Sequence, residues 1–284
     1  MEEKKKNTLY IAISALVLLP ISLLTVYASM AFSLRTIDIF GYGGGVVNVF
    51  VPVLFAIYLL MLTMMVYILY GIKGGNITCG FLRAEGVIFT TMVFALILNS
   101  FMVEWLSSFA SPLVMVMLFI GILIKPKVGL VSCLTSAMAA IILTTPLSYL
   151  ITPSQFSLSG MLGTVDAFVS AFFMSFLLRG KKFTRFSLTW GTLAISVVTS
   201  LIGGLLALMD SWDFQSMLNG YFSSVIGNVV AVCIFTTILP IYESVSRIWT
   251  DFKLAELCSL NQPVLKKMSE DAPGTFSHAL TVAN

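Results

Sequence analysis

Charged residues and histidine are scarce in this chain. Asp, Glu, Lys and Arg together make up 10% of its 284 residues, whereas they supply about 25% of an average soluble protein. There is a single histidine, while 58% of the residues are hydrophobic and the mean hydropathy is +0.99. This composition excludes an ordinary soluble domain. It predicts an integral membrane protein, with the lipid bilayer as its surroundings and no nucleic acid among its partners.

Cysteine is also sparse, and its spacing excludes the common metal and disulfide motifs. None of the four cysteines has a partner at metal or redox spacing. Cys133 and Cys233 lie in apolar runs, and Cys79 and Cys258 lie in segments that we place in the cytosol. We therefore expect unpaired thiols at all of these positions.

Eight apolar stretches are long enough to form membrane-spanning helices. A helix rises about 1.5 Å per residue and must cross a hydrocarbon core of roughly 30 Å. The first stretch follows Lys4, Lys5 and Lys6 and is longer than the apolar region of a signal peptide. The sequence thus predicts an all-α, polytopic helical membrane protein with spans at about Thr8–Phe32, Val46–Tyr70, Glu85–Val103, Ser108–Ile124, Val128–Leu150, Gly160–Leu178, Ser187–Leu208 and Leu218–Leu239.

The basic residues divide unevenly between the two sides of the predicted membrane. Of the sixteen Lys and Arg residues, all except Arg35 fall on the side that carries both termini when the chain has eight spans. Loops rich in Lys and Arg usually stay in the cytosol. We therefore expect cytosolic N and C termini, with the most basic loop, Arg179–Arg185, on the same side.

Polar side chains inside the predicted spans are few. Asp166 lies within the sixth span, and no intramembrane Lys, Arg or His is available to pair with it. Two interpretations of Asp166 stay open: a ligand-binding residue in an outward-facing pocket, or a carboxylate at headgroup level. We expect Asn99, Asn219 and Asn228 to hydrogen-bond between helices, and Gly203–Gly204 to let a neighbouring helix approach closely.

The C-terminal tail is the only polar portion of any size. Apolar residues at helical spacing predict a helix over Ile241–Leu260 that continues the last span as a stiff lever. A membrane-surface helix or a dimer-packing helix fits the same periodicity. Pro263 ends this segment, and Thr275 is placed to cap a later helix that contains His278. By composition alone, a lone histidine is usually structural or solvated.

The tail resembles a known bacterial junction between a membrane domain and a catalytic domain. The relevant motifs are Leu239-Pro240 with Glu243, TDFKLAEL at Thr250–Leu257, NQPVLKK at Asn261–Lys267 and EDAPGTFSHALTVAN at Glu270–Asn284. They are similar to those of the seven-transmembrane HD phosphohydrolases, a bacterial family whose cytosolic HD domain hydrolyses cyclic di-AMP. The resemblance covers the tail almost residue for residue and extends more loosely over the membrane segments from about Val46.

The resemblance implies that His278, which follows the Ala-Pro-Gly-Thr turn, is a ligand of a two-metal site. The complete protein would then hold a pair of divalent transition metal ions (Mn or Fe) and bind cyclic di-AMP. The His-Asp pair that names the domain would lie beyond Asn284.

Because one imidazole cannot hold two metal ions, we expect the 284-residue chain by itself to carry no metal and to be catalytically inactive. Relatives commonly hold a large extracellular domain after the first span, and Ser33–Gly45 is too short for one.

Three parts are predicted along the chain: a transmembrane domain at 1–240, a cytosolic linker helix at 241–262 and the start of an HD domain at 263–284. The leading expectation is the membrane and signal-coupling part of a cyclic di-AMP phosphodiesterase in the bacterial inner membrane, with a homodimer as a further expectation. The alternative is a small-molecule transporter or ligand-binding membrane module whose tail docks a partner. A transporter should show interrupted helices with polar groups that converge near the membrane midplane.

Overall fold

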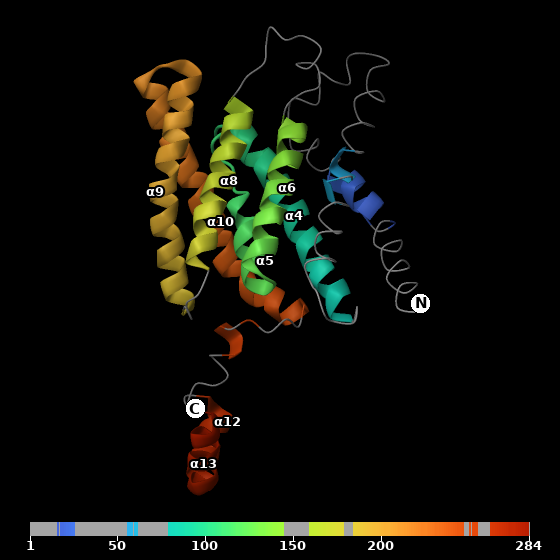
Figure 1. Ribbon diagram of the computed structural model, residues 1–284, viewed down its shortest axis with the longest axis vertical. Helices are drawn as coiled ribbons and strands as arrows, with labels where there is room; N and C mark the ends of the chain where they lie inside the picture. Colours follow the sequence, from blue (N-terminus) through green and yellow to red (C-terminus); the bar gives the residue numbers. More distant parts are fainter. Residues whose placement is uncertain are drawn as a thin grey trace.

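The architecture is helical throughout the part of the chain that the structure describes. This computed structural model describes residues 16, 18–25, 56–58, 60–61, 79–144, 159–178, 184–246, 250, 252–254 and 262–283, and no strand occurs among them. The all-α class predicted from the sequence is therefore confirmed. The helices, shown in Figure 1, are α4 (Cys79–Trp105), α5 (Val114–Leu123), α6 (Pro126–Thr144), α8 (Ser159–Leu177), α9 (Arg185–Ser211), α10 (Phe214–Ser246), α12 (Pro263–Asp271) and α13 (Pro273–Ala283).

Five of these helices are long and apolar enough to cross a membrane, namely α4, α6, α8, α9 and α10. They correspond to the third, fifth, sixth, seventh and eighth predicted spans, so the chain is a multi-pass helical membrane protein. The first two predicted spans, Thr8–Phe32 and Val46–Tyr70, lie largely outside the described residues. The total of eight spans therefore stays a prediction.

Helix α9 places its large apolar side chains outward and mostly small ones inward. On α9, Phe186, Trp190 and Val198 are more than 60% exposed. The buried face of the same helix consists of Leu188, Thr192, Ser196, Thr199, Ser200, Gly203, Gly204 and Ala207. Apolar patches of this kind mark a membrane-facing surface, while small residues let helix backbones approach closely. The distribution is that of a bundle surrounded by lipid.

Helix α5 is the centre of the bundle. It packs against α4, α6, α8 and α10, and its residues Val114 to Ile120 are at most 1% exposed. The helix has 10 residues, which span about 15 Å and fall short of the predicted span Ser108–Ile124. The shortfall has a local cause, because Pro112 lacks an N–H and disfavours helical backbone at the residue before it. The fourth span is therefore helical only in its second part.

The close approach predicted at Gly203–Gly204 is confirmed. A Cβ atom at Gly203 would lie 2.8 Å from Asp166 Oδ2 and 2.9 Å from Ser224 Cβ, and one at Gly204 would lie 3.1 Å from the Met217 carbonyl oxygen. From the other side, a Cβ at Gly220 would lie 2.4 Å from Ala207 Cβ. Glycine is needed at these positions because any side chain would separate α9 from α8 and α10.

Helix α10 continues the last span into the tail, as predicted, but only part of the expected length is confirmed. It runs through Pro240 to Ser246. The expected continuous helix over Ile241–Leu260 is wrong at Thr250, which is not helical. The side chain of Thr250 accepts a hydrogen bond from the Lys253 N–H at 3.3 Å. Thr250 therefore caps the short helical turn at 252–254, a role that removes it from the helix interior.

The tail ends in two short helices that pack on each other, α12 and α13. In Figure 1 they lie apart from the bundle, beyond the C-terminal end of α10. Helix α13 begins at Pro273 rather than after a Thr275 cap. Proline is well suited to the first turn of a helix, because its fixed φ matches the helical value and its missing N–H would have no partner there.

Candidate functional site

A chain of hydrogen-bonded polar side chains crosses the interface between α8, α9 and α10. Ser224 Oγ of α10 lies 2.5 Å from Asp166 Oδ2 of α8 and 3.0 Å from Ser200 Oγ of α9. Asn228 Nδ2 of α10 lies 3.3 Å from Ser200 Oγ and 3.4 Å from Ser170 Oγ of α8. Ser170 Oγ also lies 3.0 Å from Thr199 Oγ1 of α9. Three helices thus meet through one polar cluster, which we call the Asp166 cluster (Asp166, Ser170, Thr199, Ser200, Ser224 and Asn228).

The Asp166 cluster is buried. Asp166 is 2% exposed, Ser224 1% and Asn228 2%, and Ser170 and Ser200 have no exposed surface. Asp166 Oδ1 has no hydrogen-bond partner in the described part of the chain. A buried polar oxygen without a partner is costly and often marks a site with a role beyond packing. Asp166 is therefore buried inside the bundle, while its role in ligand binding and its depth in the membrane stay predictions.

The irregular segment before α5 lies beside this cluster. A Cβ at Gly163 would lie 1.9 Å from the Ser108 carbonyl oxygen, and a Cβ at Gly227 would lie 2.7 Å from the Ala110 carbonyl carbon. Gly163 precedes Asp166 by about one helical turn, and Gly227 adjoins Asn228. Ser111, 3% exposed, donates to Asn99 Oδ1 at 2.6 Å. Non-helical backbone and buried polar groups therefore occur at the same depth in the bundle.

Asp166 and the asparagines are recognisable in the sequence, whereas the serines around them are not. Asn228 does hydrogen-bond between helices, as predicted, whereas Asn219 is exposed. Ser196, Ser200, Gly203 and Gly204 recur at intervals of about four residues on the buried face of α9. That run of small residues was a usable signal, because it marks the packed side of a membrane helix.

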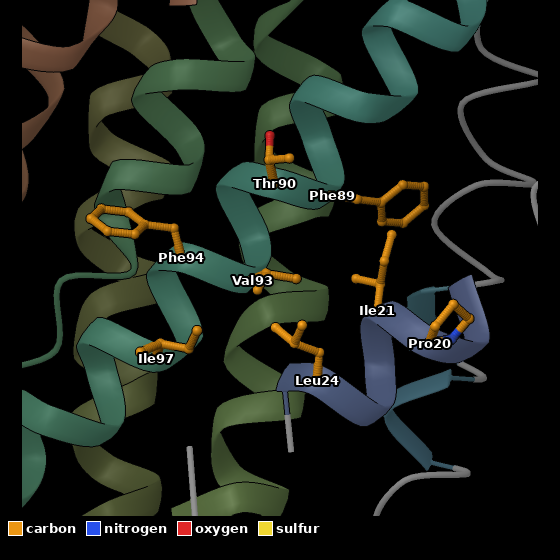
Figure 2. A pocket seen from close by; sticks show the side chains of 8 residues that line it. All are labelled: Pro20, Ile21, Leu24, Phe89, Thr90, Val93, Phe94 and Ile97. Atoms are coloured by element: carbon orange, nitrogen blue, oxygen red, sulfur yellow. The ribbon is translucent and has the colours of Figure 1, made fainter. Parts of the chain in front are cut away.

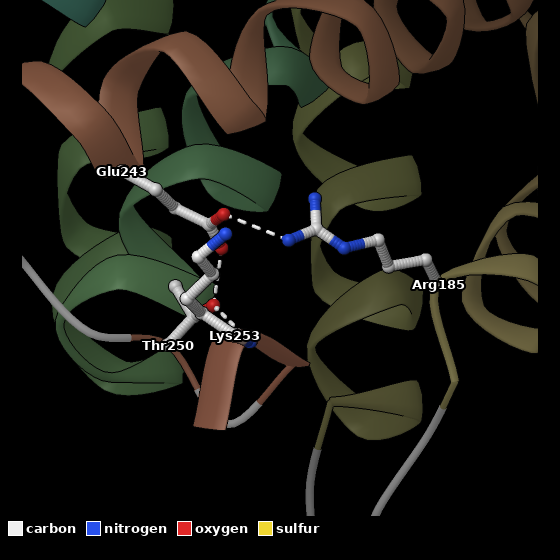
Figure 3. Close-up of polar contacts among 4 residues, drawn as sticks. All are labelled: Arg185, Glu243, Thr250 and Lys253. Atoms are coloured by element: carbon white, nitrogen blue, oxygen red, sulfur yellow. Dashed lines mark hydrogen bonds and ion pairs between the residues drawn. The ribbon is translucent and has the colours of Figure 1, made fainter. Parts of the chain in front are cut away.

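A second polar contact joins the bundle to the tail. As Figure 3 shows, Arg185 at the start of α9 reaches Glu243 near the end of α10, with Arg185 Nη2 2.8 Å from Glu243 Oε2. The other carboxylate oxygen, Glu243 Oε1, accepts a hydrogen bond from the Thr250 hydroxyl. The Glu243 side chain is 5% exposed and that of Arg185 is 31% exposed. One carboxylate thus connects α9, α10 and the segment that leads to the tail.

The structure places His278 on the exposed surface of α13. Among the described residues, no group of three or more His, Cys, Asp or Glu side chains is arranged to hold a metal ion. Cys133 and Cys233 are free thiols. The described residues therefore do not form a complete metal site around His278, and its role as a ligand stays a prediction.

An apolar groove of about 370 Å³ lies between residues 20–24 and α4 (Figure 2). Its lining is Pro20, Ile21, Leu24, Phe89, Thr90, Val93, Phe94 and Ile97. The hydroxyl of Thr90 is already engaged, since it donates to the Gly86 carbonyl at 2.8 Å and accepts from Tyr242 Oη at 3.2 Å. The groove thus offers apolar contact but no unengaged polar group to orient a ligand.

Comparison with known proteins gives one partial match. A segment of 59 residues is 36% identical to the cyclic-di-AMP phosphodiesterase PgpH of Listeria monocytogenes serotype 1/2a (strain 10403S), and it covers 21% of this chain and 8% of that protein. The chain thus matches less than a tenth of the length of this curated relative. No protein-family model matches the chain, and no solved structure matches it.

Proposed function

We propose that this chain forms the membrane and signal-coupling part of a cyclic di-AMP phosphodiesterase. The observation that carries the proposal is the 36% identity over 59 residues to a protein named for that activity. The five apolar helices agree with a membrane domain. Under this proposal the chain divides into a transmembrane domain (1–240), a linker (241–262) and the start of an HD domain (263–284), with both termini in the cytosol of a bacterium.

The bundle and the tail are physically connected in a way that suits signal coupling. Glu243 holds Arg185 through one oxygen and Thr250 through the other, so a shift of α9 against α10 changes the position at which the tail begins. A coupling element needs two packed arrangements that ligands or conditions can bias. Among the described residues, the contacts of Glu243 are where a change in the packing of the bundle would reach the tail.

His278 is proposed as one ligand of a pair of divalent transition metal ions, Mn or Fe, in the complete protein. The imidazole is exposed on a helix and so is accessible to a metal ion. The other ligands would come from outside the described residues. When bound, such a pair clamps a phosphate group and lowers the pKa of a bound water. Cyclic di-AMP would be the substrate of the complete protein.

The test compares hydrolysis of cyclic di-AMP by a chain extended through an HD domain with and without the imidazole. His278→Ala should lower turnover by about 100-fold or more, since mutation of the groups that merely support a metal ligand already costs about 10- to 100-fold. Ser277→Ala, on the same exposed helix, is the matched control and should retain activity. The 284-residue chain alone should bind no stoichiometric transition metal. Full activity in the extended His278→Ala variant would refute the role of His278.

One observation favours the alternative, a small-molecule transporter. The fourth span is interrupted before α5, and the Asp166 cluster lies at the depth of that interruption. Broken helices with converging polar groups are typical of transporter binding sites. An extended chain that folds and inserts but hydrolyses no cyclic di-AMP would remove the first proposal and leave this one.

A further inference from the structure

Asp166 is an acid that lies among helices which, within the described part of the chain, place no base near it. Four described helices pack on α8, namely α5, α6, α9 and α10. Helix α5 has no charged residue, and the charged residues of the others lie near the helix ends: Lys127, Arg185, Asp210 and Glu243. Asp166 forms no salt bridge within the described residues. Among the side chains that the structure describes, those around the carboxyl group are therefore neutral.

The separation along the helices shows how isolated Asp166 is. Gly203 of α9 faces the Asp166 carboxyl group, and Arg185 lies about 27 Å from Gly203 at 1.5 Å per residue. Glu243 lies about 28 Å along α10 from Ser224 by the same measure. Asp210 is nearer, at about 10 Å along α9, but it is exposed and also acidic. Lys127 begins α6 at the end of the bundle that carries Arg185 and Glu243 (Figure 1).

The hydrogen-bond chain is one proton short when Asp166 is ionised. Ser200 Oγ donates to the Ser196 carbonyl oxygen at 2.7 Å. Ser224 then has one hydrogen for two acceptors, Asp166 Oδ2 at 2.5 Å and Ser200 Oγ at 3.0 Å, because a serine hydroxyl donates once. A proton on Asp166 Oδ2 removes the shortage. Asp166 would donate to Ser224, Ser224 to Ser200, and Ser200 to Ser196.

Charge balance leads to the same assignment. An ionised carboxylate in an apolar interior requires a compensating positive charge. Because Asp166 is a single carboxylate, it requires a single positive charge. The hydroxyl and carboxyl oxygens of the cluster already lie within direct hydrogen-bonding distance of their neighbours, from 2.5 to 3.0 Å. A proton fits between them without moving them, whereas a metal ion would have to separate Ser224 from Asp166. A neutral acid also leaves Oδ1, which has no partner in the described chain, as a carbonyl rather than an anion.

We propose that Asp166 is a proton-binding site that holds α8, α9 and α10 together in its neutral form. The proton is shared along Asp166, Ser224 and Ser200. Asp166 lies about 10 Å from the N-terminal end of α8, at the same end of the bundle as the α9–α10 turn (Figure 1). In the proposed topology that end faces away from the cytosol, so the site would respond to external acidity. The inference does not depend on the proposed hydrolase activity.

Infrared spectroscopy of the 284-residue chain in lipid nanodiscs tests the proposal directly. The wild type minus Asp166→Asn difference spectrum at neutral pH should contain the carbonyl band of a neutral carboxylic acid. Asp213→Asn, in the exposed α9–α10 turn, is the matched control and should not remove that band. In Ser224→Ala the band should shift, because the acid loses the hydroxyl to which it donates. A carboxylate band in place of the acid band, or no shift in Ser224→Ala, would overturn the proposal.

Thermal unfolding in detergent gives a second readout. The folded state holds a proton that the unfolded chain releases, so stability should fall as the pH rises. Asp166→Asn imitates the neutral acid and should unfold at nearly the wild-type temperature at neutral pH, with a weaker dependence on alkaline pH. If that variant does not fold, the Ser224→Ala infrared shift still decides. If sodium at fixed pH stabilises the wild type and not Asp166→Asn, the site binds a metal cation and the proton assignment is wrong.

Discussion

Glu243 is the residue at which α9, α10 and the start of the tail meet. Its carboxylate is buried and accepts from the half-buried Arg185 and from the Thr250 hydroxyl. The sequence showed Glu243 within an exit motif and Arg185 within a basic loop. It gave no sign that they pair, since 58 residues separate them. Pairings between distant residues are set by packing, and no local pattern in the chain encodes them.

Glu243→Gln should destabilise the folded protein and loosen the tail. The substitution keeps an acceptor for Thr250 but leaves the Arg185 guanidinium without its carboxylate. Hydrogen bonds to charged groups contribute about 1.5–3 kcal/mol, and the partial exposure of Arg185 reduces this to about 1–2 kcal/mol. The unfolding temperature in detergent and proteolysis of the tail after residue 246 measure the two effects.

The matched control is Glu270→Gln, which removes an exposed carboxylate from α12. Surface charges of this kind contribute little to stability, so the control should unfold like wild type. The double variant Arg185→Gln with Glu243→Gln should cost less than the sum of the two single changes, as expected for residues in contact. Equal unfolding temperatures for Glu243→Gln and Glu270→Gln would exclude the contact.

At the scale of helices, the sequence predicted the long spans well and the short central helix poorly. Helices α8 and α9 agree with the predicted sixth and seventh spans to within three residues, and α4 and α10 contain the predicted third and eighth spans and extend beyond them. Apolar length alone identifies a spanning helix. The length of helix α5 was overestimated because Ser111 is the only polar residue from Phe109 to Leu123. Hydropathy therefore could not locate the break at Pro112.

Gly220→Ala tests the close packing of α9 against α10. The added Cβ would lie 2.4 Å from Ala207 Cβ, so the helices must separate or shift. Overpacking of this kind typically costs about 1–3 kcal/mol, and we expect a lower unfolding temperature in detergent.

Gly86→Ala in α4 is the matched control for this change. A Cβ at Gly86 would have no atom within 4 Å, and alanine in a helix interior is favoured over glycine by about 0.5–1 kcal/mol. The control should therefore be neutral or stabilising. If the two substitutions have the same effect, the α9–α10 contact is not as close as described.

For the whole molecule, the sequence predicted the class and left the interior unresolved. Composition was sufficient for an all-α membrane protein, and the positions of lysine and arginine were sufficient to propose an orientation. The Asp166 cluster depends on six side chains from three helices. Only Asp166 and Asn228 stood out in the sequence, because serine and threonine are common in any helix. Which hydroxyls meet depends on helix rotation, and that is decided by glycines such as Gly203.

The orientation can be tested with two reporter fusions at opposite ends of α9. This helix has 27 residues and is about 40 Å long, which exceeds the roughly 30 Å hydrocarbon core. Its ends must therefore emerge on opposite sides. Arg185 and Glu243 lie at one end and Trp212 at the other. The basic residues Lys181 and Lys182 adjoin the Arg185 end, so we expect that end in the cytosol.

A reporter fused after Lys182 should behave as cytosolic, and one fused after Asp213 as external. If thiol labelling or protease digestion places both positions on one side, α9 does not cross the membrane and the proposed external access to Asp166 is lost.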